Sequence, residues 1–333
     1  MNRILLAFIL LAFISLSCNQ NNINEKNKQE NLIKIKELSN KINNDFIPIR
    51  NEVSKLAELI QYLYQNQANI NCNDENLYEL SKDGVYYKNK NDGKSAVFVS
   101  GYIPINKEIK RIVCFTEPLD TFFIRSLKEN NAFAQLYYND KNSYNRIYPF
   151  FDVLTQYEKK MNIPSFNFYY LADYKHNPEK KAVWVNEPYV DPAGRGWMVS
   201  TIAPVYYNNE MVGVSGIDVT INQITDKYFK TENQDIIIAD ASGIIVSANE
   251  QIINLLNLPT LINHKYFETI KQDTYKKEDY NLLQNKNKNI RIAFENIIKN
   301  KSEFEKLSID DTNYFLYVSV IKELNWFVVK ISN

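Results

Sequence analysis

The apolar residues between Leu32 and Leu63 are spaced like those on one face of a single long helix. They recur at steps of three and four residues, and this spacing places them on one side of an α-helix. Pro48 lies off this stripe, so we expect it to kink the helix rather than to end it. The pattern therefore predicts a long N-terminal helix over residues 32–66.

After Asn71 the helical spacing gives way to short alternating runs separated by turns. Such runs predict strands, and the pair Asn208-Asn209 predicts a tight hairpin between two of them. The strands expected from these runs are 83–89, 95–103, 110–115, 132–140, 166–173, 182–190, 196–207, 210–220, two within 234–249, 313–321 and 325–332. The helices expected between them are 117–131, 148–161, 221–230, 250–257 and 290–300.

Two successive antiparallel sheets with helices outside them define the expected fold class, which is α+β. We place a first module at residues 67–219, directly after the long helix. A second, smaller module follows at residues 220–333.

The first residues have the organisation of a secretory signal. A short basic start precedes an uncharged run from Ile4 to Ser17, which is short for a membrane span. The small residue before Cys18 resembles a lipobox, although the nearest Leu is at position 16 rather than three places before the Cys. We predict a lipoprotein signal peptide at residues 1–17, with an uncleaved anchor or an ordinary signal as the alternatives.

Lipidation of Cys18 would hold the protein to a membrane outside the cytoplasm, because the buried methylenes of several acyl chains add in free energy. The following residues, 18–31, contain almost no apolar side chains. They predict a disordered tether. Of the other cysteines, Cys72 and Cys114 are expected either to form a disulfide or to be two small buried side chains.

Composition and motifs exclude several classes of function. Lys plus Arg equals Asp plus Glu, at 39 each, so the chain shows no polycationic signal for nucleic acid. It has no glycine-rich phosphate-binding motif and no His or Cys cluster with metal-ligand spacing. Because no nucleophile and base stand in a recognisable catalytic context, we expect neither an enzyme nor a bound cofactor.

A series of short motifs recurs in a fixed order through the second half of the chain. The motifs are Trp184, Pro188-Tyr189-x-Asp191, Gly196-Trp197-x-x-Ser200, Pro204-Val205, Gly213-x-x-Gly216-x-Asp218, Asp240-x-Ser242-Gly243 and Leu324-Asn325-Trp326. In order and spacing they resemble the double-Cache extracytoplasmic sensor domain, in which two PAS-like modules follow one long helix. The resemblance covers about residues 30–331, and it implies a membrane-distal module that binds small solutes and reports occupancy.

The resemblance also implies ligand-binding residues in the distal module. The amino-acid signature of this family is an Arg with nearby aromatic residues, then a further aromatic residue, then an Asp. Here Tyr148 stands where the family has Trp, and Pro149 replaces a second aromatic residue. The positions that correspond to the predicted site are Tyr144, Arg146, Tyr148, Tyr170, Asp173, Tyr189 and Asp191.

These residue types suit a zwitterion on chemical grounds as well. A guanidinium can hold a carboxylate through two parallel hydrogen bonds, while a facing Asp accepts from the ammonium. Tyrosine rings exclude water and can present a face to the cation. Structural alternatives remain for each residue. Arg146 could lie on the surface before a helix or stack on Tyr138, and the tyrosines could belong to the core. Asp191 could initiate a turn, and Asp173 could cap one.

We therefore expect an extracytoplasmic, lipid-anchored solute-binding sensor whose ligand is an amino acid or an amine. Because the chain ends with the second module, we expect the signal to pass to a separate membrane receptor or transporter. The long helix could also pair two copies into a homodimer. The alternative is a structural or interaction lipoprotein whose modules bind a partner protein and no solute.

Overall fold

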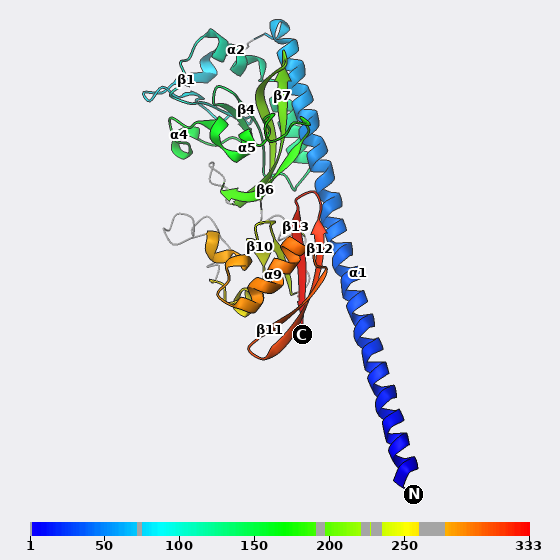
Figure 1. The fold of residues 1–333 in the computed structure, drawn as a ribbon. Helices are drawn as coiled ribbons and strands as arrows, with labels where there is room; N and C mark the ends of the chain where they lie inside the picture. The colour runs from blue at the N-terminus through cyan, green and yellow to red at the C-terminus, as the bar shows by residue number, and fades with distance from the viewer. Residues whose placement is uncertain (1, 72–74, 191–196, 221–226, 228–234, 260–276) are drawn as a thin grey trace. The chain divides into compact units, whose positions relative to one another are not determined.

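The computed structural model describes residues 2–71, 75–190, 197–220, 227, 235–259 and 277–333. The chain forms two compact units, which we name by their sheets. The eight-stranded unit is built mainly from residues 44–232, and the five-stranded unit from residues 1–43, 233–260 and 276–333. Helix α1 (Asn2–Gln65) contributes to both units (Figure 1).

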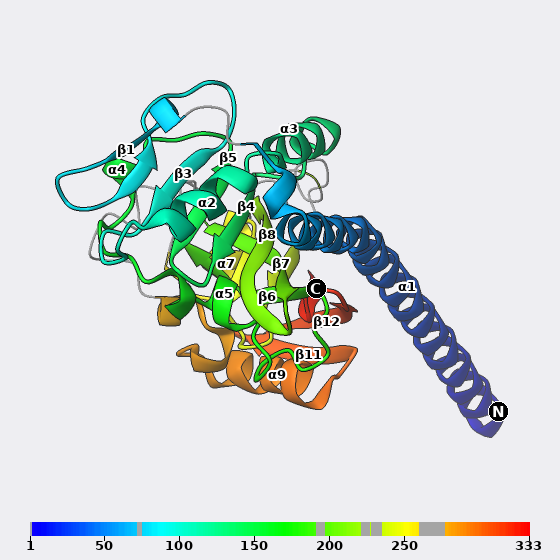
Figure 2. The same cartoon turned by 90° about the horizontal axis from the view of Figure 1, so that it is seen from above.

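The eight-stranded unit has an antiparallel sheet with the strand order β1-β2-β3-β5-β4-β8-β7-β6, which can be followed in Figure 2. Its strands are β1 (Tyr78–Leu80), β2 (Tyr86–Lys88), β3 (Ala96–Val99), β4 (Gln135–Asp140), β5 (Tyr144–Tyr148), β6 (Val183–Val190), β7 (Trp197–Tyr207) and β8 (Glu210–Thr220). Its helices after α1 are η1 (Gln67–Asn69), η2 (Glu75–Leu77), α2 (Lys107–Phe115), α3 (Leu119–Glu129), α4 (Val153–Gln156), η3 (Ile163–Ser165) and α5 (Asn167–Tyr170).

One face of this sheet, the helix face, packs against α1, α2 and α3. The part of the α1 stripe from Phe46 to Tyr64 is buried there, and the Tyr64 hydroxyl lies 2.8 Å from that of Tyr138 on β4. Phe46 of α1 contacts Trp184 of β6, with ring centroids 5.1 Å apart. The periodicity that predicted a long helix is thus explained by burial against a sheet.

The opposite face, the cover face, lies under residues 153–172, which we call the cover. The cover contains α4, η3 and α5 and belongs to a cluster of buried apolar side chains with the sheet. Because side chains alternate along a strand, β4 sends Tyr138 to the helix face and Tyr137 to the cover face.

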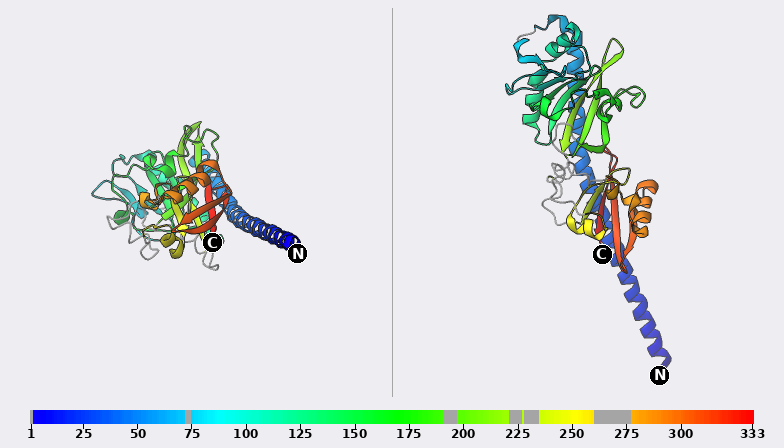
Figure 3. Two further views of the ribbon diagram at one scale, coloured as in Figure 1. Left: turned by 60° about the horizontal axis from the view of Figure 1, so that its bottom comes forward. Right: turned by 90° about the vertical axis from the view of Figure 1, so that its left-hand side faces the viewer.

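The five-stranded unit has the antiparallel order β10-β9-β13-β12-β11. The Ser319 hydroxyl on β12 lies 2.6 Å from that of Ser39 on α1. Helix α9, drawn in orange in Figure 3, lies beside β11 of this sheet and buries an apolar stripe. The elements are β9 (Ile236–Ala239), β10 (Ile245–Ala248), α7 (Glu250–Leu255), η5 (Lys277–Tyr280), η6 (Leu282–Gln284), α9 (Lys288–Asn300), β11 (Phe304–Ile309), β12 (Thr312–Ile321) and β13 (Trp326–Ser332).

The predicted α+β class is confirmed: a long N-terminal helix is followed by two antiparallel sheets with flanking helices. The disordered tether predicted for residues 18–31 is helical in this structure, because α1 is continuous. The end of this stretch contacts the five-stranded sheet. The Lys28 ammonium lies 4.4 Å from the Phe304 ring centroid, and Lys330 donates to Asn31 across 2.8 Å.

Two predicted strands are helices instead. Residues 110–115 belong to α2, because Asn106 caps that helix by accepting from the Ile109 N–H, and its buried residues recur at helical spacing. Residues 166–173 include the single turn α5 rather than a strand. The helix predicted for 148–161 is reduced to α4, and the segment predicted as a helix at 221–230 lies almost wholly outside the described residues.

Candidate functional site

The cover face carries a row of polar side chains in the middle of the eight-stranded sheet. Alternation along β4 places Gln135, Tyr137 and Asn139 on this face. The register brings Asp218 of β8 opposite Gln135, and Asn145 of β5 opposite Asn139. Three neighbouring strands therefore supply one continuous strip of the site.

Gly216 makes room for a ring at the centre of this strip. It pairs with Tyr137 in the β4–β8 register. A Cβ atom at Gly216 would overlap the Tyr137 ring, which lies across this part of β8. The glycine is thus needed because a side chain approaches the backbone there.

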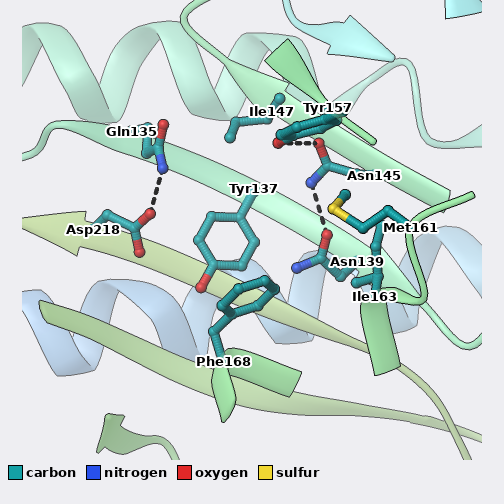
Figure 4. Close-up of a pocket in the computed structure, with 10 residues that line it drawn as sticks. All are labelled: Gln135, Tyr137, Asn139, Asn145, Ile147, Tyr157, Met161, Ile163, Phe168 and Asp218. Carbon is teal, nitrogen blue, oxygen red and sulfur yellow. Dashed lines mark hydrogen bonds between the residues drawn. The ribbon is translucent and has the colours of Figure 1, made fainter. Parts of the chain in front are cut away.

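The cover closes the strip from above and leaves a small cavity. The lining is completed by Ile147 of β5 and by Tyr157, Met161, Ile163 and Phe168 of the cover (Figure 4). The Phe168 ring meets Tyr137 nearly edge-on, with centroids 6.2 Å apart. The cavity volume is about 20 Å³, which is enough for one water molecule. A larger solute could enter only if side chains of the cover shifted.

The two ends of the cavity differ in chemistry (Figure 4). At one end the Asp218 carboxylate, with 1% of its surface exposed, accepts from the Ser200 hydroxyl and, across 2.5 Å, from the Gln135 amide. At the other end the Asn145 amide donates to Asn139 across 2.7 Å. A buried carboxylate thus faces one end of the cavity, rings line its middle, and amides line its far end.

Arg146, which we predicted to bind a ligand carboxylate, does not reach this cavity. It lies on the helix face, is fully buried, and all its nitrogen atoms donate to protein partners. Burial opposes the charge, but nearby Tyr144, Tyr78 and Asp120 hold the Arg146 pKa above its ordinary value. These donations go to Tyr144 (2.8 Å), Thr116 (3.3 Å), Ser95 (2.9 Å), Asp120 (3.4 Å), Tyr78 (3.4 Å) and the Val113 carbonyl (2.8 Å).

The arginine is therefore an internal anchor in this structure rather than a ligand contact. Its partners come from the start of the module, α2, α3 and the sheet, so it ties these segments together. Alternation explains the outcome: Asn145 and Ile147, the neighbours of Arg146, point to the cover face, so Arg146 must point away from it.

The two tyrosines predicted beside Arg146, Tyr144 and Tyr148, lie in the same strand, β5. Tyr144 is fully buried, and its hydroxyl lies 2.6 Å from that of Thr116. Burial raises the Tyr144 pKa although Arg146 opposes the shift. Tyr148 ends β5, two residues beyond Arg146, and is half-buried. The structure thus brings Tyr144 and Arg146 together but on the face away from the cavity.

Tyr170 and Asp173 lie at the end of the cover, outside the cavity. Tyr170, 38% exposed, lines a separate hollow of about 330 Å³ with His176 and Trp184. Asp173 accepts from the His176 backbone and contacts its ring nitrogen at 2.7 Å. Slight burial would raise the Asp173 pKa, but these bonds from His176 hold it below its ordinary value. Asp173 therefore acts as the turn-capping residue of this segment.

The remaining predicted residues have a mixed status. Asp191 and Cys72 lie outside the described residues, as do the side chains of Tyr189 and Cys18. Cys114 is disulfide-bonded. Within the described ranges, no group of three or more His, Cys, Asp or Glu side chains could hold a metal ion. Among those same residues no helix is both long and apolar enough to cross a membrane.

Sequence reasoning missed most of the cavity. Gln135, Tyr137, Asn139, Tyr157 and Phe168 belong to no motif that we singled out, and Asp218 stands in a family motif but not among the predicted ligand-binding residues. The alternation in β4 was a usable signal, because it places three polar side chains on one face of a central strand. The cover could not be assigned in this way, since its lining residues follow no period.

Comparison with known proteins agrees with this architecture. Residues 119–226 match the sequence profile of the methyl-accepting chemotaxis protein-like first PDC sensor domain. No curated protein sequence matches the chain significantly. Among solved structures, the ligand-binding domain of the Campylobacter jejuni chemoreceptor Tlp3 in complex with L-valine is similar, with a TM-score of 0.56 and 11% identity over 94% of this chain and 95% of that chain.

Two further structures show the same likeness. The Tlp3 sensory domain with isoleucine bound has a TM-score of 0.54 and 11% identity, and covers 94% of this chain and 95% of its own. An extracellular domain attributed to the histidine kinase soHK1S-Z6 has a TM-score of 0.54 and 12% identity, over 94% and 96%. At such identities the likeness establishes the fold. The chain therefore shares its fold with these chemoreceptor and histidine-kinase sensory domains, and its residues 119–226 match the PDC sensor profile.

Proposed function

We propose that this chain is an extracytoplasmic sensory protein that binds a small solute carrying an ammonium group. The site is the cavity on the cover face of the eight-stranded sheet, and Asp218 is the acceptor for the ammonium. The observation that carries the proposal is the position of this buried carboxylate at the end of a ring-lined cavity. A charge buried in a protein is stable when an opposite charge or hydrogen-bond donors face it.

The lining supports binding rather than catalysis. Tyr137, Phe168 and Tyr157 offer apolar walls and ring faces, which attract organic cations. The amides of Gln135, Asn139 and Asn145 offer hydrogen bonds that fix orientation. The fold supports a sensory role, because the similar Tlp3 domain was solved with L-valine and with isoleucine.

The cover supplies a route from binding to signal. Since the cavity holds only about 20 Å³, a bound solute displaces the cover from its present position. Cys18 is lipidated in this proposal, as the sequence predicts, and anchors the protein to the membrane. Occupancy of the cavity is passed to a separate membrane receptor or transporter. Pairing of two copies through α1 is part of the same proposal.

A thermal-shift screen of the full chain tests the proposed function. The panel contains amino acids, aliphatic amines, organic acids and purines. We expect at least one ammonium compound to raise the unfolding midpoint, because a ligand that binds only the folded state stabilises it. The shift should vanish in Gly216→Ala, where the new methyl group displaces Tyr137.

Leu80→Ala is the matched control, because Leu80 is 61% exposed and lies in β1 of the same sheet. It should keep the full ligand-induced shift. If no compound moves the midpoint of the wild type, the solute-binding account fails and the interaction lipoprotein becomes the better explanation. A ligand whose shift survives in Gly216→Ala would place the site elsewhere.

A further inference from the structure

The charged end of the cavity distinguishes between two classes of ammonium compound. Asp218 and Gln135 stand at this end, whereas Asn139 and Asn145 stand four residues further along the strands. Four residues of a strand span about 13 Å. The two ends are therefore too far apart for groups on one carbon atom to reach both.

The described side chains that line the cavity include one carboxylate and no cation. The buried arginine of this module, Arg146, points to the opposite face, where its donors are used by the protein. An α-amino acid bound with its ammonium on Asp218 would hold its own carboxylate beside the Asp218 carboxylate. Two like charges in a buried site repel each other strongly.

An amine without that carboxylate has no such conflict. Its ammonium replaces the neutral Gln135 amide as the donor to Asp218, and a charge-assisted hydrogen bond is the stronger one. Its apolar body then lies along the Tyr137 and Phe168 rings. Aromatic ring faces attract organic cations and so help to offset the water that the cation loses. In the complex the positive charge of the ammonium offsets the negative charge of Asp218.

We infer that the cavity selects organic amines that carry no carboxylate next to the ammonium, with Asp218 as the residue that determines this specificity. The inference rests on the proposed function, because it concerns the same cavity. It sets this chain apart from the Tlp3 domain, which was solved with L-valine and with isoleucine.

The test compares isobutylamine with L-valine by titration calorimetry on the full chain. The two compounds share an ammonium group and a branched apolar body, and they differ by the carboxylate. We expect isobutylamine to bind at least about tenfold more tightly, the factor that corresponds to 1.4 kcal/mol. Tighter binding of L-valine would overturn the inference while leaving the proposed function standing.

Asp218→Asn is the decisive variant, since it removes the charge with little change in shape. It should weaken isobutylamine binding at least about 30-fold, because truncating one member of a buried charge pair has effects of this size. The matched control is Asp140→Asn, which also neutralises a buried carboxylate on the same sheet but outside the cavity lining. It should leave the affinity unchanged within about twofold.

These measurements distinguish failure of the role of Asp218 from failure of solute binding itself. Equal losses in Asp218→Asn and Asp140→Asn would show a general effect of stability and overturn the role of Asp218. Unchanged affinity in Asp218→Asn would do the same. Binding of neither compound, with no hit in the thermal screen, would refute the proposed function itself.

Discussion

Single residues decide how the charges of the eight-stranded unit are distributed. Asp218 and Arg146 are both buried in the same sheet, yet they serve opposite faces of it. Arg146 has protein partners for its whole guanidinium, so it stabilises the module. Both carboxylate oxygens of Asp218 accept hydrogen bonds, from Gln135 and Ser200, and the side chain also lines the cavity. Of the two charged residues, only Asp218 is therefore placed where a ligand could meet it.

The role of Arg146 predicts a large loss of stability on truncation. Arg146→Ala leaves the buried Asp120 without its charged partner, so we expect the free energy of unfolding to fall by ~3–5 kcal/mol. Urea denaturation measures this change. Under conditions where Arg146→Ala is still folded, it should keep its affinity for the ligand. Loss of affinity without the predicted loss of stability would show that Arg146 binds the ligand.

Asp140 predicts a pH dependence of stability. Burial raises its pKa from 3.8 to about 6, although bonds from the Tyr144 backbone and Asn142 oppose the shift. Because the folded-state pKa is the higher one, the folded protein binds the proton more tightly than the unfolded chain. The resulting stabilisation is complete below pH 3.8 and is lost as the pH rises through about 6.

Asp140→Asn isolates this effect, because the variant stays neutral at every pH. A difference of about two pKa units corresponds to ~3 kcal/mol. The wild type should therefore lose about this much stability relative to Asp140→Asn between pH 4 and pH 7, as measured by urea denaturation. A difference that stays constant over this range would contradict the assignment.

At the scale of elements, the sequence predicted those parts that carry a strong local pattern. The apolar stripe was sufficient to place α1, and long runs of β-branched and aromatic residues between turns were sufficient to place β7, β8, β12 and β13. The run 110–115 was misread because its β-branched residues suit a strand, while the Asn106 cap that makes it helical is a single side chain. The cover was misread because turns and short helices replace periodic structure there.

The site residues were predicted less well than the elements, because they depend on long-range contacts rather than on local patterns. The family signature directed attention to Arg146, but a one-residue alternation of β5 decides which face that side chain occupies. The cavity itself depends on the register between β4 and β8 and on the packing of the cover. These are long-range contacts that no local pattern in the sequence specifies.

The cover should respond to a ligand as one element. Its turns are held by local backbone bonds, such as those from Met161 to Glu158 and from Tyr169 to Phe166. A bound solute displaces the cover and adds contacts that link it to the sheet, so we expect slower hydrogen exchange over residues 157–170 at saturating ligand. Amides of β12 in the five-stranded unit serve as the internal control. An unchanged cover would contradict the proposed coupling.

At the scale of the whole molecule, α1 is shared between the two units. Ile35 and Ile42 of α1 are buried, at 2% and 0% exposure, and belong to the five-stranded unit. The Asn43 side chain of α1 also accepts a hydrogen bond from the Glu323 backbone N–H across 2.8 Å. The first part of α1 is therefore a structural part of the five-stranded unit, and not a tether alone.

Replacement of Ile35 and Ile42 by Ala tests this role. Each truncation of a buried Ile costs ~2–5 kcal/mol, so the unfolding transition of the five-stranded unit should move to clearly lower temperature in calorimetry. Ile33→Ala is the matched control, because Ile33 lies in the same helix and is 54% exposed. Equal effects of the buried and exposed changes would contradict the packing of α1.

The location of the ligand is the central claim, and methyl NMR of methionine-labelled protein tests it most directly. Met161 lines the cavity, whereas Met211 packs at the edge of the same apolar cluster. On titration with the tightest ligand of the screen, the Met161 methyl resonance should shift in proportion to occupancy, and that of Met211 much less. A ligand that saturates the protein while the Met161 resonance stays in place would contradict the account.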